Sequence, residues 1–318
     1  MKFSRFVADV GGTNIRIATE ANGQVSNIKK YLCKDFEHIA DAIESYFAQF
    51  PDEKFDAGCI AIACPVNDDL IKMTNHSWQF SVKETKERLG LEALEVINDF
   101  TAVAMCVPVL TDTQKIKIGG GAPQVNENIA VFGPGTGLGV GHLVKSDSGW
   151  QTLDGEGGHV DFAPTNDKDI VIWQYLREQG IHPSAEEVLS GRGLVNVYKA
   201  LATDSSQTID EIDPAAITEK ALNGSCDVCE SALSQFCHVL GSFAGNLALN
   251  LGTFGGVYIA GGVVQHFVDY FADSNFRDSF EAKGRFKEYL ERIPTYLITE
   301  PDFGLIGAAA HLEQHCKG

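Results

Sequence analysis

Residues 9–14 form the first segment that could do chemistry, a glycine-rich turn directly after an apolar stretch. Its sequence is DVGGTN, so Asp9 precedes Gly11 and Gly12, and Thr13 follows them. Glycines permit a tight turn and a close approach of backbone N–H groups to phosphate oxygens. Thr13 adds a hydroxyl donor, and Asp9 could hold Mg²⁺ directly or through its waters. A plain hairpin with a glycine turn would use the same residues, so this segment alone leaves both interpretations open.

A second glycine-rich turn, GPGTGLG, supplies Gly133, Gly135, Thr136 and Gly137. Two such turns that face each other could hold a β- and a γ-phosphate from both sides. Neither turn is a Walker loop, because no GK[ST] follows. Neither is a dinucleotide fingerprint, because the second turn is expected to enter a strand and not a helix. The pair therefore indicates nucleotide phosphate binding.

The sequence IND ends an apolar stretch with two polar side chains, Asn98 and Asp99. A carboxylate at the end of a strand is well placed in a cleft, where Asp99 could accept the proton of an attacking alcohol. The amide of Asn98 could fix a sugar through its donor and its acceptor. A strand-ending Asx turn is the alternative interpretation.

A third glycine-rich segment, GEGGH, carries Glu156 and His159, and Glu186 follows in the sequence SAE. A carboxylate and an imidazole three residues apart in such a turn could converge on vicinal hydroxyls. Sugar sites need groups of this kind because hydroxyls both donate and accept hydrogen bonds. Glu156 and His159 could instead bind a metal, although a third ligand is not obvious.

The segment GGVYIAGG places glycine pairs on both sides of a hydrophobic strand, at Gly255, Gly256, Gly261 and Gly262. Glycines would let a flat adenosine lie against the backbone. A core strand with a turn at each end explains the same residues, and on this segment alone it is the better explanation.

Short strands and helices must position these groups. In the first part of the chain, period-two and period-3.6 patterns predict strands at 6–12, 15–21, 25–33, 57–66 and 94–99, and helices at 36–50 and near 83–90. In the second part they predict strands at 129–135, 137–145, 255–262 and 296–301, and helices at 228–251, 263–271 and 304–315. Strands that alternate with helices after three initial strands predict an α/β chain with a mixed sheet.

Composition narrows the class of protein. The chain has 318 residues, which suits two packed lobes better than one core. Its formal net charge of -18 makes nucleic acid and membrane surfaces poor partners. No apolar run is long enough to cross a bilayer. The start of the chain, MKFSRFVADVGG, is expected to be a strand and not a signal peptide, so we expect a cytoplasmic protein.

Eight cysteines are present, several of them in apolar contexts such as GCIAIACPV, where a free thiol acts as a small hydrophobe. Cys226 and Cys229 form one CxxC pair, which without a second pair is a weak zinc signal. We interpret this pair as reduced thiols at the start of the helix expected from residue 228, and we expect no zinc.

The chain resembles bacterial glucokinases of the ATP-dependent hexokinase type, within the actin-like ATPase superfamily. The resemblance spans nearly the whole chain and follows the order of the motifs above. It is carried by CIAIACPV, MTNHSW, INDFTAVAM, GTGLGV, GEGGHVDFAP, SAEEVLSG, GNLALNLGTFGGVYIAGG, GRFKEY and GLIGAAAHL. The related repressor–kinase group usually carries a cluster of histidine and cysteines near GEGGHVDFAP, and none is present there, which favours the glucokinase branch.

The resemblance implies a particular fold. It implies two ribonuclease-H-like α/β lobes with a central cleft, the first at residues 1–109 and the second at 110–300. Residues 301–318 would form a helix that returns to the first lobe.

The resemblance also implies roles for the candidate residues. Asp99 would be the catalytic base, and Asn98, Glu156, His159 and Glu186 would hold sugar hydroxyls. The nucleotide would contact both glycine turns and the GGVYIAGG segment, at Ala8, Asp9, Val10, Gly11, Gly12, Thr13, Gly133, Gly135, Thr136, Gly137, Gly255, Gly256, Gly261 and Gly262.

The implied reaction is ATP-dependent phosphorylation of glucose at O6. Mg²⁺ would be held by Asp9 through water, and the protein would be a homodimer. A kinase of another hexose or of an amino sugar, or a sugar-sensing regulator without activity, would share most of these motifs.

Overall fold

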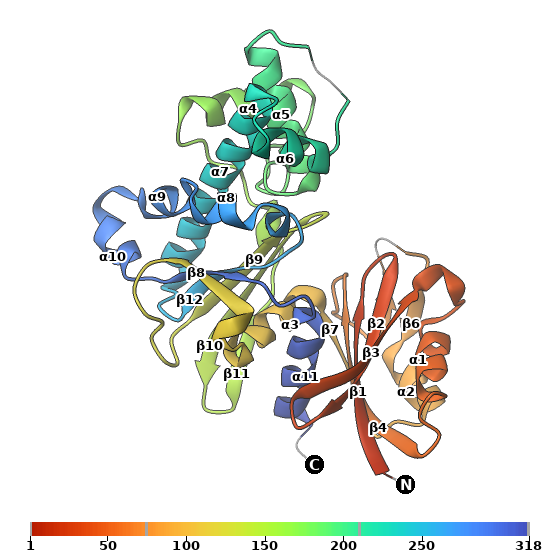
Figure 1. Ribbon diagram of the computed structural model, residues 1–318. Coiled ribbons are helices and arrows are strands. Elements are labelled where there is room, and N and C mark those ends of the chain that lie inside the picture. Colours follow the sequence, from red (N-terminus) through yellow and green to blue (C-terminus); the bar gives the residue numbers. More distant parts are fainter. Residues whose placement is uncertain (1, 74–75, 209–210, 317–318) are drawn as a thin grey trace. The chain divides into compact units, whose positions relative to one another are not determined.

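A computed structural model describes residues 2–73, 76–208 and 211–316. Thr74 and Asn75, which belong to the MTNHSW segment, lie outside the described residues. Contacts within the chain define two compact units. Unit 1 comprises residues 1–111, 146–152 and 300–318, and unit 2 comprises residues 112–145 and 153–299. Each unit is a mixed α/β structure (Figure 1).

Unit 1 is built on a sheet in the order β3-β2-β1-β4-β7. The strands are β1 (Lys2–Val10), β2 (Asn14–Ala21), β3 (Gln24–Leu32), β4 (Glu53–Ile62) and β7 (Ala93–Asn98). Strands β1, β4 and β7 are parallel, and the hairpin strands β2 and β3 extend the sheet antiparallel. A small hairpin of β5 (Leu70–Lys72) and β6 (Gln79–Ser81) and the 3₁₀ turns at Cys33–Asp35 and Val107–Val109 complete the connections.

Helices cover both faces of this sheet (Figure 1). They are α1 (Ile39–Phe47), α2 (Val82–Leu89), α3 (Asp99–Cys106) and α11 (Phe303–His315). Because successive strand residues point to opposite faces, Phe6 of β1 belongs to the core beneath α1, and its neighbour Val7 belongs to the core beneath α11. The backbones of α11 and α3 come very close, since a Cβ on Gly307 would lie 1.7 Å from the carbonyl oxygen of Ala102.

In unit 2, neighbouring strands run in the order β10-β9-β12-β13-β8. They are β8 (Lys115–Gly119), β9 (Ile129–Pro134), β10 (Leu138–Ser146), β12 (Gly256–Ile259) and β13 (Thr295–Ile298). The central strands β9, β12 and β13 are parallel, whereas β10 and β8 pair antiparallel at the two sides. Strand β11 (Gly149–Leu153) follows β10 in the chain. Residues 146–152 belong to unit 1, and there Trp150 exchanges two hydrogen bonds with the side chain of Gln314.

The helices of unit 2 surround α7. They are α4 (Asp167–Glu178), α5 (Gly191–Asp204), α6 (Pro214–Leu222), α7 (Asp227–Leu251), α8 (Val268–Ala272), α9 (Phe276–Glu281) and α10 (Lys287–Glu291), with short 3₁₀ turns at Asp112–Gln114, Gly157–His159, Val264–His266 and Gly284–Phe286. The predicted apolar face of α7 is buried, at Leu233, Phe236, Leu240, Phe243 and Leu247. Gly252 ends the helix in the left-handed conformation at φ 59°.

One predicted helix was wrong. Residues 263–271 do not form a continuous helix, because the 3₁₀ turn Val264–His266 is followed by a break at Phe267, with φ -146° and ψ 43°. The break turns the Phe267 ring into the core, where it lies edge-on to Phe236. Burial of this ring outweighs the local preference for helix.

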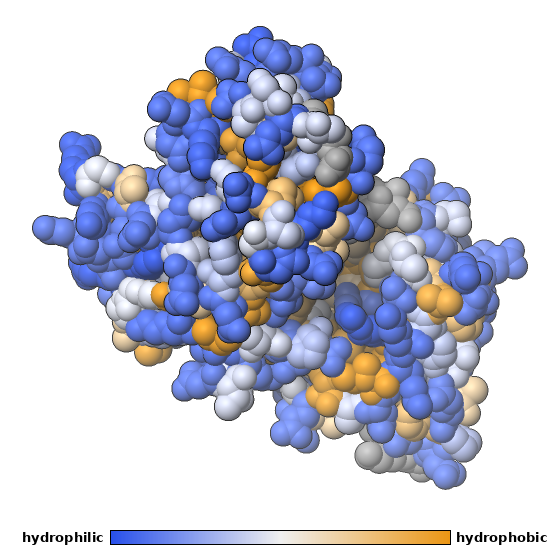
Figure 2. All heavy atoms as spheres, turned by 45° about the horizontal axis from the view of Figure 1, so that its top comes forward, coloured by the Kyte–Doolittle hydropathy of each residue, from blue (hydrophilic) through white to orange (hydrophobic). Residues whose placement is uncertain are grey.

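The visible surface is mostly hydrophilic, with hydrophobic residues in small separate groups (Figure 2). Within the described ranges, no helix has the length and apolar character that a membrane crossing requires.

Candidate functional site

The first glycine turn joins β1 to β2. The N–H of Gly11 donates to the carbonyl oxygen of Asn14 at 3.0 Å, and the N–H of Cys33 donates to the carbonyl of Thr13 at 2.9 Å. These bonds close the turn from both sides. The side chains of Ala8 and Val10 belong to the buried core, so only their backbone could contact a ligand.

Asp9 lies one residue before the end of β1, directly opposite Arg16 of β2 in the antiparallel ladder. Nη1 of Arg16 and Oδ2 of Asp9 form an ion pair at 3.1 Å, and the Asp9 side chain is 25% exposed. On its other side, a Cβ on Gly304 would lie 3.0 Å from the Asp9 carboxyl carbon. Burial raises the pKa of the Asp9 carboxyl, the Arg16 charge opposes that rise, and the negative charge of Asp302 adds to it.

Asn98 ends β7 and caps α3. Its Oδ1 accepts the N–H of Phe100 at 2.9 Å, and its Nδ2 donates to the carbonyl of Cys64 at 3.2 Å. Asp99 is the first residue of α3 and also accepts from the N–H of Phe100, at 2.9 Å. The helix N-terminus favours a carboxylate at this position. The capping role that the Asx alternative anticipated is therefore present, and one hydrogen and one lone pair of the Asn98 amide are left for a ligand.

The candidates of unit 1 share one edge of its sheet. Val10 pairs with Ile62, and Ile62 pairs with Asn98, so the parallel strands β1, β4 and β7 end level with one another. The first glycine turn and Asp99 follow directly from these ends. Ligands of open α/β sheets bind at the carboxyl ends of the strands.

The second glycine turn joins β9 to β10, and a carboxylate from outside the turn supports it. Oε2 of Glu186 accepts the N–H of Leu138 at 2.9 Å, and a Cβ on Gly137 would lie 2.6 Å from the same oxygen. Oε1 of Glu186 lies 3.3 Å from a guanidinium nitrogen of Arg192. Inside the turn, the N–H of Gly135 donates to the carbonyl of Gly137 at 2.8 Å.

The GEGGH turn lies beside Glu186. The N–H of Glu186 donates to the carbonyl of Gly158 at 2.9 Å, and a Cβ on Gly158 would lie 2.0 Å from the carbonyl oxygen of Leu138. Glu156 and His159, on either side of this close approach, are exposed. The structure thus brings Glu156, His159, Glu186 and the second glycine turn together in unit 2.

The two glycine pairs of GGVYIAGG are separated by strand β12. Gly261, at φ +99°, packs on the end of β9, where its Cβ would lie 2.6 Å from the carbonyl oxygen of Pro134. Gly262 next to it is exposed. Gly255 and Gly256 precede or begin β12 at its other end, and a Cβ on Gly255 would lie 2.5 Å from the carbonyl oxygen of Glu127. Only Gly261 and Gly262 adjoin the second glycine turn.

Sequence reasoning missed Arg16 and Asp302, which set the charge around Asp9. The partnership of Arg16 could have been found, because a hairpin with its turn at residues 11–13 places residue 16 opposite residue 9. No comparable signal exists for Asp302, which is almost three hundred positions away in the sequence.

The CxxC pair is a helix cap. Sγ of Cys226 accepts the N–H of Cys229 at 3.2 Å, at the start of α7, and Cys229 is buried. Both ring nitrogens of the nearby His238 are engaged, Nδ1 with Ser279 at 2.7 Å and Nε2 with Thr165 at 2.9 Å.

Residues 6–315 match the family described as Glucokinase. A glucokinase of Cronobacter sakazakii is 52% identical over 310 residues, which cover 97% of this chain and 96% of that protein. A crystal structure of glucokinase from an Antarctic psychrotroph superposes with a TM-score of 0.92 at 37% identity, over 98% of both chains. A ROK family glucokinase from Streptomyces griseus, solved with glucose and AMPPNP, shares the fold at a TM-score of 0.64 and 21% identity, covering 96% of this chain and 98% of its own.

Proposed function

Because this chain belongs to the glucokinase family, we propose that Asp99 orients and deprotonates the 6-hydroxyl of glucose in the ATP-dependent phosphorylation that this family catalyses. The observation that carries the proposal is the common edge of β1, β4 and β7. There the carboxylate of Asp99 and the first glycine turn follow strands that end level with one another. A base and a phosphate-binding turn on one rigid edge can hold an alcohol in line with a phosphorus atom.

In this mechanism, O6 of glucose attacks the γ-phosphorus of ATP, the bond to the β–γ bridging oxygen breaks, and ADP leaves. The O6 proton passes to Asp99. A carboxylate is a weak base for an alcohol, so orientation of O6 contributes at least as much as proton abstraction in a loose transition state. Backbone N–H groups of the two glycine turns stabilise the charge that develops on the phosphoryl oxygens.

The sugar is held by Asn98 from unit 1 and by Glu156, His159 and Glu186 from unit 2. Asn98 offers the remaining hydrogen and lone pair of its amide. The exposed side chains of Glu156 and His159 supply an acceptor and a ring nitrogen. Glu186 connects the sugar to the second glycine turn, because its carboxylate already holds Leu138.

The nucleotide would contact Ala8–Thr13 in unit 1 and Gly133–Gly137 with Gly261 and Gly262 in unit 2. Gly255 and Gly256 are left out of this proposal because they lie at the far end of β12. The partly exposed carboxylate of Asp9 fits an Mg²⁺ ion held through water, which would neutralise phosphate charge.

The proposed architecture is two ribonuclease-H-like lobes that enclose the substrates in a central cleft, with residues 301–318 belonging to the first lobe. A cytoplasmic homodimer completes the proposal. The acidic composition agrees with an absence of nucleic acid and membrane partners.

An ADP-coupled assay across a panel of hexoses and amino sugars tests the function. Glucose is expected to give the highest kcat/KM, and Asp99→Asn is expected to lose turnover with every sugar. Preference for another sugar would reassign the substrate. Glucose binding without any ADP release would favour the sugar-sensing alternative.

A further inference from the structure

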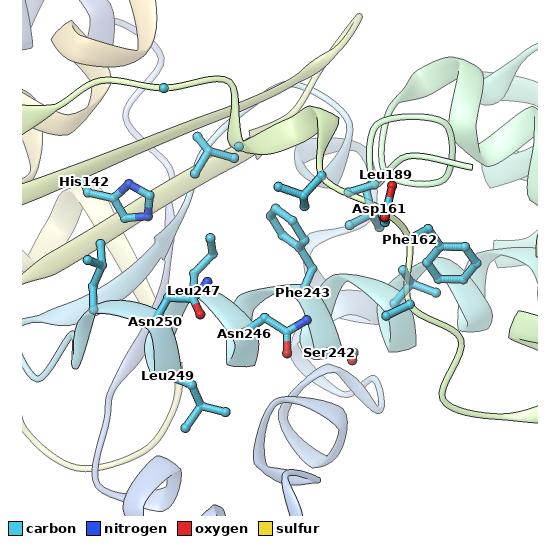
Figure 3. Close-up of a pocket in the computed structure, with 18 of the residues that line it drawn as sticks. His142, Asp161, Phe162, Leu189, Ser242, Phe243, Asn246, Leu247, Leu249 and Asn250 are labelled. Carbon is cyan, nitrogen blue, oxygen red and sulfur yellow. The ribbon is translucent and has the colours of Figure 1, made fainter. Parts of the chain in front are cut away.

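Unit 2 contains a cavity of about 600 Å³ that none of the catalytic assignments uses. It lies between β10, the segment from Leu153 to Ala163, and α7 (Figure 3). Most of its lining is apolar, and the lining includes Val140, Phe162, Leu189, Phe243 and Leu247. The polar side chains of the lining are His142, Asp154, Asp161, Asp169, Ser242, Asn246 and Asn250. The carboxylates of Asp161 and Asp169 are already bound to His182 and Gln235. A cavity of this size with a mainly apolar wall is typical of sites for small organic molecules.

His142 is the polar group on the strand side of this cavity, opposite the α7 residues Asn246 and Asn250 (Figure 3). Its ring hydrogen-bonds to the backbone of Leu153. Its Nε2 atom is buried and has no hydrogen-bond partner among the described residues. Burial lowers the pKa of His142, so the ring is neutral at neutral pH and one nitrogen is an acceptor. A buried acceptor without a partner is unfavourable, and a donor group on a ligand would satisfy it.

We propose that this cavity binds a small, neutral, mainly apolar molecule that donates one hydrogen bond, from an N–H or O–H group, to Nε2 of His142. Ordered water is a poorer occupant, because each water molecule needs about two to four polar partners and most of this wall offers none. The mouth suits such a ligand as well. The exposed members of the lining include Leu153 and Val160, with 43% and 51% of their surface exposed, and the amides of Asn246 and Asn250.

The cavity shares a wall with the sugar residues. Gly155, Gly157 and Val160 line it, and they belong to the same turn as Glu156 and His159. An occupant would support this turn from behind. If the turn binds glucose, as the proposed function requires, ligand and glucose should each tighten the binding of the other, by the same factor.

Indole and 1-methylindole are matched probes, because they share an apolar body and only indole has an N–H donor. Calorimetric titration is done with saturating MgADP, so that the nucleotide site is occupied and the flat indole ring cannot bind there. We expect indole to bind about three- to tenfold more tightly than 1-methylindole, the preference that one hydrogen bond supplies. The preference should vanish in His142→Phe, which keeps a ring of similar size and removes the acceptor.

A second pair of variants tests whether indole binds in this cavity. Asn246→Trp, at the exposed mouth, should abolish indole binding, whereas Glu230→Trp, exposed on the same helix and away from the cavity, should leave it unchanged. No binding of either probe to the wild-type protein, or equal binding to both Trp variants, overturns the site. A preference that survives His142→Phe overturns the role of His142.

Repeating the titration with saturating glucose tests the coupling separately. An indole affinity that glucose leaves unchanged overturns the coupling and not the site. Absence of glucose binding, measured in the same instrument without indole, would count against the proposed function itself.

Discussion

Glu186 accepts the backbone N–H of Leu138 at 2.9 Å, across 48 positions of sequence. The same carboxylate lies where a side chain on Gly137 would have to be, so it supports the second glycine turn directly. A residue expected to hold a sugar hydroxyl is thus also part of the structure expected to hold phosphate. Its removal should be felt by both substrates.

Glu186→Ala is expected to raise the KM for glucose and for ATP together, each by about tenfold, the usual effect of losing a charged hydrogen-bond partner. Steady-state kinetics with each substrate varied in turn measures this. Glu187→Ala is the matched control, because Glu187 shares Arg192 but makes no bond to the turn. An unchanged KM for ATP in Glu186→Ala would mean that the carboxylate contacts only the sugar.

Asp99→Asn is expected to lower kcat and kcat/KM alike by about 10²–10⁴-fold, because the amide cannot accept the O6 proton. The amide oxygen can still accept from Phe100, so the variant should fold and bind ATP normally. Asp167→Asn changes the first residue of α4 in the same way and should leave turnover unaffected. Turnover within a few-fold of wild type in folded Asp99→Asn would remove Asp99 as the base.

The charges around Asp9 predict two opposite shifts in the pH profile. If ionised Asp9 is needed for MgATP, activity is lost as pH falls through its pKa. Arg16→Gln removes the charge that lowers this pKa, so the acid limb of kcat/KM should move to higher pH. Asp302→Asn removes a charge that raises it, and should move the limb to lower pH.

Arg88→Gln is the control for this pair, because Arg88 is ion-paired with Asp41 and Glu44 and has no contact with Asp9. If Arg16→Gln and Asp302→Asn shift the acid limb in the same direction, Asp9 is not the group that titrates.

Gly307→Ala should destabilise the protein. Alanine is better than glycine inside a helix by about 1 kcal/mol. Here the added methyl group would meet the carbonyl of Ala102 at 1.7 Å, and overpacking of this kind costs about 1–3 kcal/mol or more. The midpoint of urea unfolding, followed by circular dichroism, should fall. Gly191→Ala, whose methyl group would meet its nearest atoms at an ordinary 3.6 Å, should change it little. A midpoint raised by Gly307→Ala would show that α11 moves away from α3 easily.

Metal analysis separates magnesium from zinc. Excess chelator should abolish turnover and Mg²⁺ should restore it, because ATP reacts as its magnesium complex. The purified protein should contain no stoichiometric zinc.

Cys226→Ser should leave stability nearly unchanged, since serine is a preferred N-cap and can accept the N–H of Cys229 as the thiol does. One tightly bound zinc per chain, lost in Cys226→Ser, would contradict this interpretation.

Hydrophobic patterns in the sequence predicted those helices and strands whose formation depends mainly on neighbouring residues. The apolar run of β1 and the periodic face of α7 were sufficient. Strand β1 is buried on both faces of its sheet, and α7 buries one regular set of side chains. The break at Phe267 was not predictable in this way, since it depends on a pocket beside Phe236, which is distant in the sequence.

Among the candidate site residues too, only features that depend on adjacent residues could be predicted. Glycine turns and strand-ending carboxylates are visible in sequence, because each depends on a few adjacent residues. The support of Leu138 by Glu186 depends on two separate segments meeting, and nothing in either segment indicates it. The separation of Gly255 from Gly261 by a whole strand could have been expected from strand length, since each residue adds about 3.3 Å.

The docking of α11 in unit 1 has a consequence for synthesis. Domains generally fold in the order in which the ribosome delivers them. Here one core of unit 1 joins Val7 and Cys59 to Leu305 and Leu312, so it needs residues that are translated after all of unit 2. Until then, the face of the sheet that α11 will cover is left open to other hydrophobic chains. The part of the protein that is made first is therefore the last to be finished, and the nascent chain depends on the interrupting unit folding promptly by itself.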